Sequence, residues 1–218
     1  MSVTDIKMRC NGGTSAPISA SVKPGDSVEA IWQQWTHSQG PIMVWMYKCA
    51  GDFGACDGSG KGWFKIDQAG FTPKSGIFLD TEVNSGWAIA TLVGGNKGWT
   101  SKIPNLAPGN YLIRHELVAL HQANNPQFYA ECAQLQVTGS GTGVPSGSYL
   151  TSIPGYVSQN DPTIKVSSAL LAAGLQRCNT NWYDQFNINN HSLPQTYTFP
   201  GPAVYGTSAA KKARDFTA

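Results

Sequence analysis

Apolar residues gather in five short runs over the first two thirds of the chain, and glycine- and proline-rich segments separate these runs. The runs cover residues 27–35, 42–49, 63–66, 110–121 and 131–138. Pro-Gly dipeptides at 24–25, 108–109 and 154–155, and the Gly/Ser-rich stretch 139–148, are typical of turns and loops between strands. Short strands at this spacing predict an all-β protein, built as an antiparallel β-sandwich with long loops.

The segment 167–175, SSALLAAGL, breaks this pattern because it predicts a helix within extended, proline-rich chain. If residues 166–185 are removed, Lys165 joins Phe186 smoothly and the number of cysteines becomes even. We therefore hypothesise that residues 166–185 are the translation of an unspliced intron; the alternative is a helical insertion at the surface. The predicted organisation is one domain over residues 1–205, interrupted by 166–185, and a C-terminal tail over 206–218.

Length and charge exclude several classes of protein. The chain has 218 residues, which suits one domain with a substantial core. Charged residues make up 13%, the net charge is +2, and the basic cluster 211–214 lies in the tail, so we expect no nucleic-acid partner. No apolar run is long enough to span a bilayer, so we expect no membrane partner. We expect a monomer.

The cysteines follow neither CxxC nor zinc-ribbon spacing; they are Cys10, Cys49, Cys56, Cys132 and Cys178. Cys49 and Cys56 flank a Gly/Asp-rich turn, which suits a short disulfide loop. A bond between Cys10 and Cys132 could close a very long loop and stabilise the fold by roughly 4–5 kcal/mol in the chain-entropy model. Cys178 would then remain unpaired. Disulfides favour an extracellular protein, whereas the start, Met-Ser-Val-Thr-Asp, has no features of a signal peptide.

The run 114–132, RHELVALHQANNPQFYAEC, contains the strongest candidate for a functional site. His121 shares strand parity with His115, and after the Asn-Asn-Pro turn Gln127 and Tyr129 project from one face. An imidazole, a carboxamide and a phenol that converge on one spot indicate a polar site for a metal or for oxygen. The alternative is a hydrogen-bonded polar patch, in which Tyr129 packs its ring and its hydroxyl finds a partner.

Other candidate residues lie outside this run. His37 lies between a predicted strand and a Gly-Pro turn, and neutral imidazole is a good ligand of copper, zinc and iron. As a lone loop histidine it could also be a plain surface residue. Tyr197, in a proline-rich segment, is either a surface platform for a sugar ring or a tyrosine that covers the edge of the core. Arg114 and Glu116 alternate on one strand face, which predicts a structural ion pair.

Several short motifs occur in a fixed order along the chain. They are Cys10-Asn11, WTHSQGP (35–41), WFKI (63–66), PGNYL (108–112), RHE (114–116), ALH (119–121), QFY (127–129), VTGSG (137–141) and PGP (200–202). In this order they resemble the fungal lytic polysaccharide monooxygenases of auxiliary-activity family nine, formerly glycoside hydrolase family 61. The resemblance runs from about residue 4 to residue 205, interrupted by 166–185.

The resemblance implies roles for five residues. His37 corresponds to a histidine that binds one copper ion, and Tyr129 to the tyrosine whose hydroxyl caps that copper. His121 and Gln127 correspond to residues that orient bound oxygen or peroxide and so take part in catalysis. Tyr197 is similar to a tyrosine of the family that stacks on the substrate.

The resemblance also implies a fold, a reaction and partners. The fold is an immunoglobulin-like (fibronectin-like) β-sandwich of an extracellular protein, with disulfides Cys10–Cys132 and Cys49–Cys56. The reaction is copper-dependent oxidative cleavage of cellulose or a related β-glucan, by hydroxylation at C1 or C4. The partners are an external electron donor and dioxygen or hydrogen peroxide.

One feature of the family is not found in this sequence. Relatives begin with a histidine whose amino group and side chain also bind copper, and Met1-Ser-Val stands here in place of that region. We therefore expect copper binding to be weak or absent, cleavage to be impaired, and the gene model to be incomplete. The alternative function is a non-catalytic relative that binds polysaccharide or cell wall; a purely structural β-sandwich is a third possibility. The retained His37, His121, Gln127 and Tyr129 favour the enzyme.

Overall fold

The computed structural model describes residues 1–71, 86–122, 124–165 and 197–206. The strands in these ranges are β1 (Ala20–Val22), β2 (Ser27–Trp32), β3 (Ile42–Lys48), β4 (Trp63–Ala69), β5 (Lys97–Lys102), β6 (Gly109–Ala119) and β7 (Gln127–Val137). Short 3₁₀ helices complete the described elements: η1 (Ile6–Met8), η2 (Phe53–Ala55), η3 (Ala88–Leu92) and η4 (Gly147–Tyr149). None of the helices in these ranges has the length and apolar character of a membrane span.

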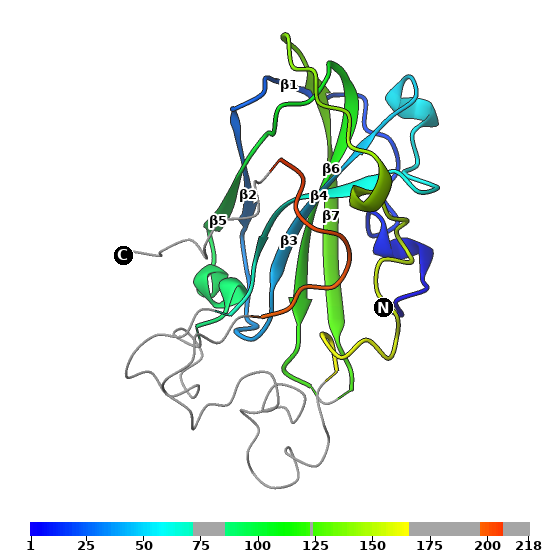
Figure 1. Cartoon of the computed structure of the whole chain (residues 1–218). Helices are drawn as coiled ribbons and strands as arrows, with labels where there is room; N and C mark the ends of the chain where they lie inside the picture. Colours follow the sequence, from blue (N-terminus) through cyan, green and yellow to red (C-terminus); the bar gives the residue numbers. More distant parts are fainter. Residues whose placement is uncertain (72–85, 123, 166–196, 207–218) are drawn as a thin grey trace, which may run out of the picture.

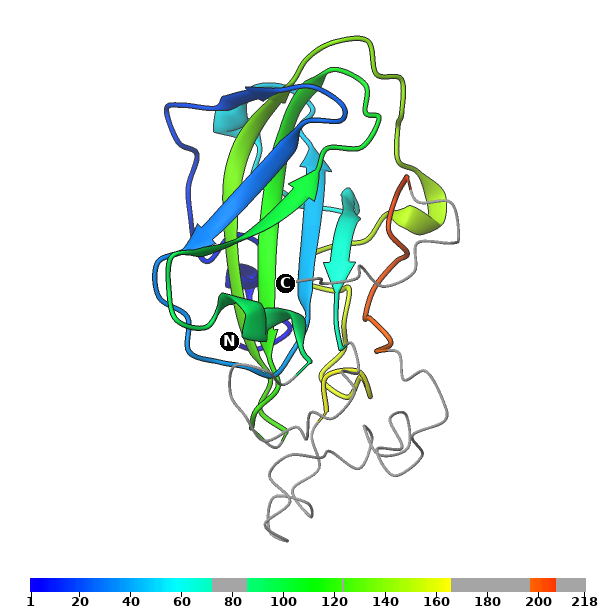
Figure 2. The same ribbon diagram turned by 90° about the vertical axis from the view of Figure 1, so that its left-hand side faces the viewer.

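The strands form two sheets, which confirms the prediction of an all-β sandwich. The larger sheet has the order β1-β7-β6-β3-β4, and the smaller one pairs β2 with β5 (Figures 1 and 2). All pairs are antiparallel except β1 with β7, which run parallel from Ala20↔Leu135 to Val22↔Val137. The larger sheet is therefore mixed rather than purely antiparallel.

The five-stranded sheet is covered on both faces, because successive side chains of a strand point to opposite sides. On β3, Ile42, Val44 and Met46 belong to the apolar cluster beneath the β2–β5 sheet. Met43 and Trp45 point the other way, into a second cluster with Met8 of the N-terminal segment and residues of 149–165 and 197–206. In Figure 2 the segments 149–165 and 197–206 lie on the side of the large sheet opposite to β2 and β5. As a result, β6 is buried at every position from 111 to 119.

The predicted runs 42–49 and 110–121 coincide closely with β3 and β6, and the run 63–66 is the first half of β4. The run 27–35 extends three residues beyond β2, and the run 131–138 misses the first four residues of β7. β1 and β5 were not predicted. β1 has only three residues, and β5 contains two lysines, a glycine and two small polar residues. Its inward side is provided by Trp99 and Ser101 alone, so its apolar signal is weak. The predicted helix 167–175, the proposed insertion 166–185, the tail from 207 and Cys178 lie outside the described residues.

Both predicted disulfides are present. Cys10 is bonded to Cys132 on β7, and Cys49 is bonded to Cys56 across the short loop that contains η2. The first bond attaches the N-terminal segment to the large sheet across a sequence separation of 122 residues.

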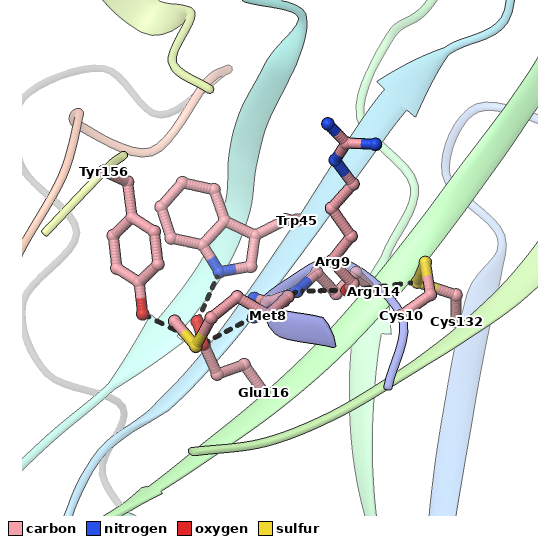
Figure 3. Close-up of polar contacts among 8 residues, drawn as sticks. All are labelled: Met8, Arg9, Cys10, Trp45, Arg114, Glu116, Cys132 and Tyr156. Atoms are coloured by element: carbon pink, nitrogen blue, oxygen red, sulfur yellow. Dashed lines mark hydrogen bonds and ion pairs between the residues drawn. A yellow bond between two sulfur atoms is a disulfide. The ribbon is translucent and has the colours of Figure 1, made fainter. Parts of the chain in front are cut away.

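The predicted ion pair of Arg114 and Glu116 exists, and it lies in the core with both side chains fully buried. The Nη2 atom of Arg114 donates to Glu116 Oε1 at 2.6 Å, and its Nε and Nη2 atoms also donate to the carbonyls of Met8 and Arg9. Glu116 accepts two further hydrogen bonds, from the Tyr156 hydroxyl and from Trp45 Nε1 (Figure 3). Arg114 thus satisfies the carbonyls at the end of η1 and holds the N-terminal segment against β6.

A second buried cation, Lys65 on β4, lies on the same face of the large sheet. Its Nζ atom donates to Gln68 Oε1 and to the Pro200 carbonyl, both at 2.9 Å, and lies 5.0 Å from the centre of the Trp45 ring. Burial lowers the pKa of Lys65 to about 7, and the nearby negative charge of Glu116 opposes this shift only in part. Lys65 therefore attaches the segment 197–206 to β4 with an ammonium group that the core destabilises.

This lysine predicts a rise of stability with pH. The unfolded chain keeps Lys65 protonated up to a pKa of about 10.4, so between about pH 7 and pH 10 the unfolded state binds more protons than the folded state. Relative to Lys65→Met, the wild type is expected to gain about 2 kcal/mol of unfolding free energy between pH 7 and pH 9. Urea unfolding at the two pH values measures the change. The exposed Lys61→Met is the matched control, and an equal pH response of wild type and Lys65→Met would contradict the prediction.

Candidate functional site

The residues predicted to form a polar site come together at one end of the sandwich. His37 lies in the connection between β2 and β3, while Gln127 and Tyr129 lie on β7 directly after the β6–β7 connection that contains His121. Both connections reach the lower end of the molecule in Figure 1. The His37 Nε2 atom lies 3.0 Å from the Tyr129 hydroxyl, and that hydroxyl donates to Gln127 Oε1 at 2.7 Å.

The two hydrogen bonds of the Tyr129 hydroxyl define which of its neighbours is the donor and which the acceptor. Tyr129 has one hydroxyl proton, which Gln127 Oε1 accepts, so the Tyr129 oxygen accepts a proton from His37 Nε2–H. The amide of Gln127 is oriented in turn by Gln122, whose Oε1 accepts from Gln127 Nε2 at 3.2 Å and from Asn125 Nδ2 at 2.6 Å. Sequence reasoning did not select Gln122 or Asn125, although both lie within the run 114–132.

His121 stacks on His37, with ring centres 4.3 Å apart and planes inclined by 14°. The nitrogen lone pairs of an imidazole lie in the plane of its ring. In two parallel, stacked rings these lone pairs therefore lie in separate planes and do not converge on one ion. Burial lowers the pKa of His37. The pKa of His121 is lowered by burial and then by the nearby His37. Both rings are therefore neutral over a wider pH range than a free histidine, and a neutral ring has a nitrogen lone pair for a metal or a proton. The buried Nδ1 atom of His121 has no hydrogen-bond partner among the described residues.

The loop that carries His37 is fixed by backbone contacts to β6 and η3. The Gln39 carbonyl accepts from Leu120 N at 2.8 Å, the Pro41 carbonyl accepts from Val118 N at 3.1 Å, and the Gly40 carbonyl accepts from Ile89 N at 3.3 Å. Gly40 has a φ of +142°, and a Cβ atom there would overlap the carbonyl oxygen of Val118. Glycine is therefore required for the loop to approach β6 and place His37 beside His121.

Gly40→Ala is expected to lower the unfolding free energy by at least about 2 kcal/mol, because the new methyl group must displace backbone and the positive φ is strained. Thermal or urea unfolding measures the loss. Gly51→Ala is the matched control, since no atom lies within 4 Å of its added Cβ, and it should stay within about 0.5 kcal/mol of the wild type. Equal effects of the two substitutions would show that the close approach of the loop does not matter.

His37 Nε2 and the Tyr129 oxygen are two atoms at this site that could bind a metal ion through their lone pairs. Their separation of 3.0 Å is that of a hydrogen bond, so both would bind a metal only after that bond is given up. A nitrogen donor in a tetragonal arrangement suits Cu(II). The described ranges contain no group of three or more His, Cys, Asp or Glu residues placed to hold a metal, so the pair covers only part of a coordination sphere.

Tyr197 does not lie at a free surface. Its ring is only 6% exposed and contacts Trp87 and Phe199, and its hydroxyl donates to the Thr163 carbonyl at 2.9 Å. Burial is the main cause that raises the pKa of Tyr197. The expected surface position of this ring is therefore wrong, and the ring packs as the alternative of a tyrosine that covers the core predicts. A role of Tyr197 in substrate binding stays a prediction. The ring of Tyr197 packs edge-to-face against Trp87 and Phe199. The contact with Trp87 joins distant parts of the chain, so the local sequence around Tyr197 does not predict it.

The fold and the site define a β-sandwich protein with a histidine–tyrosine donor pair at one end. Residues 1–173 match the model of Auxiliary Activity family 9, formerly GH61. The chain is 60% identical over 220 residues to the AA9 family lytic polysaccharide monooxygenase D of Thermothelomyces thermophilus, an alignment that covers 100% of this chain and 78% of the relative. It is 42% identical over 207 residues to the AA9 family lytic polysaccharide monooxygenase B of Heterobasidion irregulare, covering 93% and 74%.

A solved structure agrees with these relatives. The crystal structure of a cellulose-active polysaccharide monooxygenase from M. thermophila superposes with a TM-score of 0.78 at 60% identity, covering 94% of this chain and 82% of that one. The chain belongs to Auxiliary Activity family 9. Its relatives are lytic polysaccharide monooxygenases, so the family is one of oxidoreductases.

Proposed function

We propose that the protein takes part in copper-dependent oxidative cleavage of cellulose or a related β-1,4-glucan, by hydroxylation at C1 or C4. The observation that carries the proposal is the alignment of His37 Nε2, the Tyr129 hydroxyl and Gln127 Oε1 in a chain of this family. The two disulfides agree with secretion, and a secreted, monomeric protein could reach an insoluble glucan.

His37 and Tyr129 would hold the copper ion, which supplies one-electron chemistry for activating dioxygen or hydrogen peroxide with electrons from an external donor. His37 would offer its Nε2 lone pair in the tautomer that carries the ring proton on Nδ1, so the ring would stay neutral. The Tyr129 hydroxyl donates its hydrogen bond to Gln127 Oε1, so a lone pair of its oxygen faces His37, and this oxygen would be the weaker of the two metal donors.

His121 and Gln127 would manage protons and orientation beside the ion. His121 has a buried Nδ1 atom without a partner among the described residues, and its ring is held in place by the stack on His37. A neutral imidazole in this position can accept or return a proton at an oxygen co-substrate. Gln127, held by Gln122, fixes the Tyr129 hydroxyl and limits its rotation.

A second candidate is a protein that binds polysaccharide without oxidising it. One observation favours it: within the described ranges, the site offers two donor atoms and no cluster of three metal-binding residues. In that case the polar group around Tyr129 would serve as a hydrogen-bonded patch on the binding surface.

One assay separates the two functions. The protein is incubated with Cu(II), amorphous cellulose, ascorbate and hydrogen peroxide, and the soluble products are examined by mass spectrometry while bound protein is measured by sedimentation. C1- or C4-oxidised oligosaccharides that disappear in Tyr129→Phe/His37→Ala protein support the monooxygenase. Binding to cellulose without oxidised products supports the binding protein and rejects the oxidative proposal for this chain.

A further inference from the structure

Trp35 lies against both donor rings of the candidate site. It precedes His37 by two residues, beyond the end of β2, and only 7% of its surface is exposed. The centre of its ring lies 5.2 Å from that of His37 and 5.0 Å from that of Tyr129. In both pairs the planes are inclined by 89°. One buried indole therefore makes two perpendicular contacts, one to each ring that carries a donor atom.

Perpendicular contacts restrict ring orientation, since the positive edge of one ring faces the negative face of the other. Each such pair contributes about 0.5–1.5 kcal/mol beyond the burial of area, and tilting either ring weakens it. The contact of His37 with Tyr129 is itself less constraining, because these rings are tilted by 41° at 5.6 Å. The stack of His121 on His37 also allows rotation within the plane. Trp35 is thus the residue that contacts both donor rings and restricts the orientation of each.

The indole of Trp35 lowers the stability of the fold relative to an apolar ring in the same place. Its Nε1–H group is buried and has no hydrogen-bond partner among the described residues. An unsatisfied buried donor costs about 1–3 kcal/mol, which a phenylalanine in the same place would avoid. Functional sites commonly lower the stability of a protein, and this unpaired Nε1–H group lies directly beside the candidate site.

We infer that Trp35 is a positioning residue that sets the relative orientation of His37 and Tyr129, and hence where the two rings would present their donor atoms to a copper ion. This role rests on the proposed function, and it goes beyond it because Trp35 provides no donor atom to the metal. The indole acts through shape: it holds the two rings so that the His37 nitrogen and the Tyr129 oxygen stay 3.0 Å apart.

The test compares Trp35→Leu, Trp35→Phe and Trp99→Leu. Trp99 is a buried indole of the same apolar cluster, on β5, with its Nε1 atom bonded to Asp67, and it serves as the control for lost volume. Copper affinity is measured by calorimetry, and the Cu(II) environment by electron paramagnetic resonance. In metal-free protein, the ¹⁵N shifts of the His37 ring measure the proton on Nε2.

Trp35→Leu is expected to weaken copper binding by about 10–100-fold, as is usual for residues that orient metal ligands, and to change the Cu(II) spectrum and the His37 ¹⁵N shifts. Trp35→Phe, which keeps a ring, should restore both signals, while Trp99→Leu should leave them as in the wild type. An unchanged spectrum and affinity in Trp35→Leu would overturn the positioning role. A wild-type Cu(II) spectrum that does not respond to His37→Ala would instead reject the proposed metal site, so the two failures are distinguishable.

Discussion

Replacing His37 with alanine is expected to weaken Cu(II) binding by at least about 100-fold, because residues that merely orient metal ligands already contribute 10–100-fold. His37 is the one imidazole whose ring nitrogen lies next to another donor atom in the described part of the site. His121 cannot replace it, since its ring is parallel to that of His37 and held by the loop after β6. Isothermal calorimetry with a copper-buffering ligand measures the loss.

Two further variants make this result specific. Thr36→Ala changes the exposed neighbour of His37 and should bind copper as the wild type does. Tyr129→Phe removes only the weaker oxygen donor, so its loss of affinity should be well below that of His37→Ala. If His37→Ala binds copper with the wild-type affinity, the ion binds elsewhere and the assignment of the site is wrong.

Arg114→Met is expected to lower the unfolding free energy by about 3–5 kcal/mol, the usual cost of removing one partner of a buried ion pair. The substitution leaves the buried carboxylate of Glu116 without its ion-pair partner, and it removes the donor for the carbonyls of Met8 and Arg9. Urea unfolding with both disulfides intact, followed by tryptophan fluorescence, measures the loss.

The double variant Arg114→Met/Glu116→Gln tests the cause. Glutamine carries no charge and keeps one acceptor oxygen, which can serve Trp45 or Tyr156 but does not replace both carboxylate oxygens. Because the buried charge is removed, the double variant should still be more stable than Arg114→Met alone by about 1–3 kcal/mol. Asp57→Asn is the control for a solvent-exposed pair: it weakens the contact with Arg9, and its cost should stay below about 1 kcal/mol. Additive effects of the two core substitutions would show that charge pairing is not what stabilises this region.

The fold was predictable where side-chain alternation is strong. β3 and β6 carry large apolar residues at consecutive or alternate positions, and turn residues mark where they begin. β5 was missed because its inward side has only Trp99 and a serine. The parallel pairing of β1 with β7 depends on contacts between residues more than a hundred positions apart, which no local pattern contains.

The site was predictable to the extent that strand parity and a turn bring residues together. The Asn-Asn-Pro turn predicted that Gln127 and Tyr129 project on one side near His121, and the structure brings all three to His37. Their roles in binding copper and oxygen remain a proposal. Trp35 was not singled out, because an apolar ring two positions before a histidine has no local signal that separates it from the core. The surface position expected for Tyr197 was wrong for the same reason: distant contacts decide which way a ring faces.

The burial of β6 on both faces limits how this protein can be engineered. From 111 to 119 every side chain packs against one layer or the other, so no position on this strand is free for changing activity without disturbing packing. β2, by contrast, is exposed at alternate positions and tolerates substitution there. Variation of specificity is therefore best directed to exposed positions near the site that carry none of its side chains, such as Gln33, Gln34 and Thr36, while β6 is left unchanged.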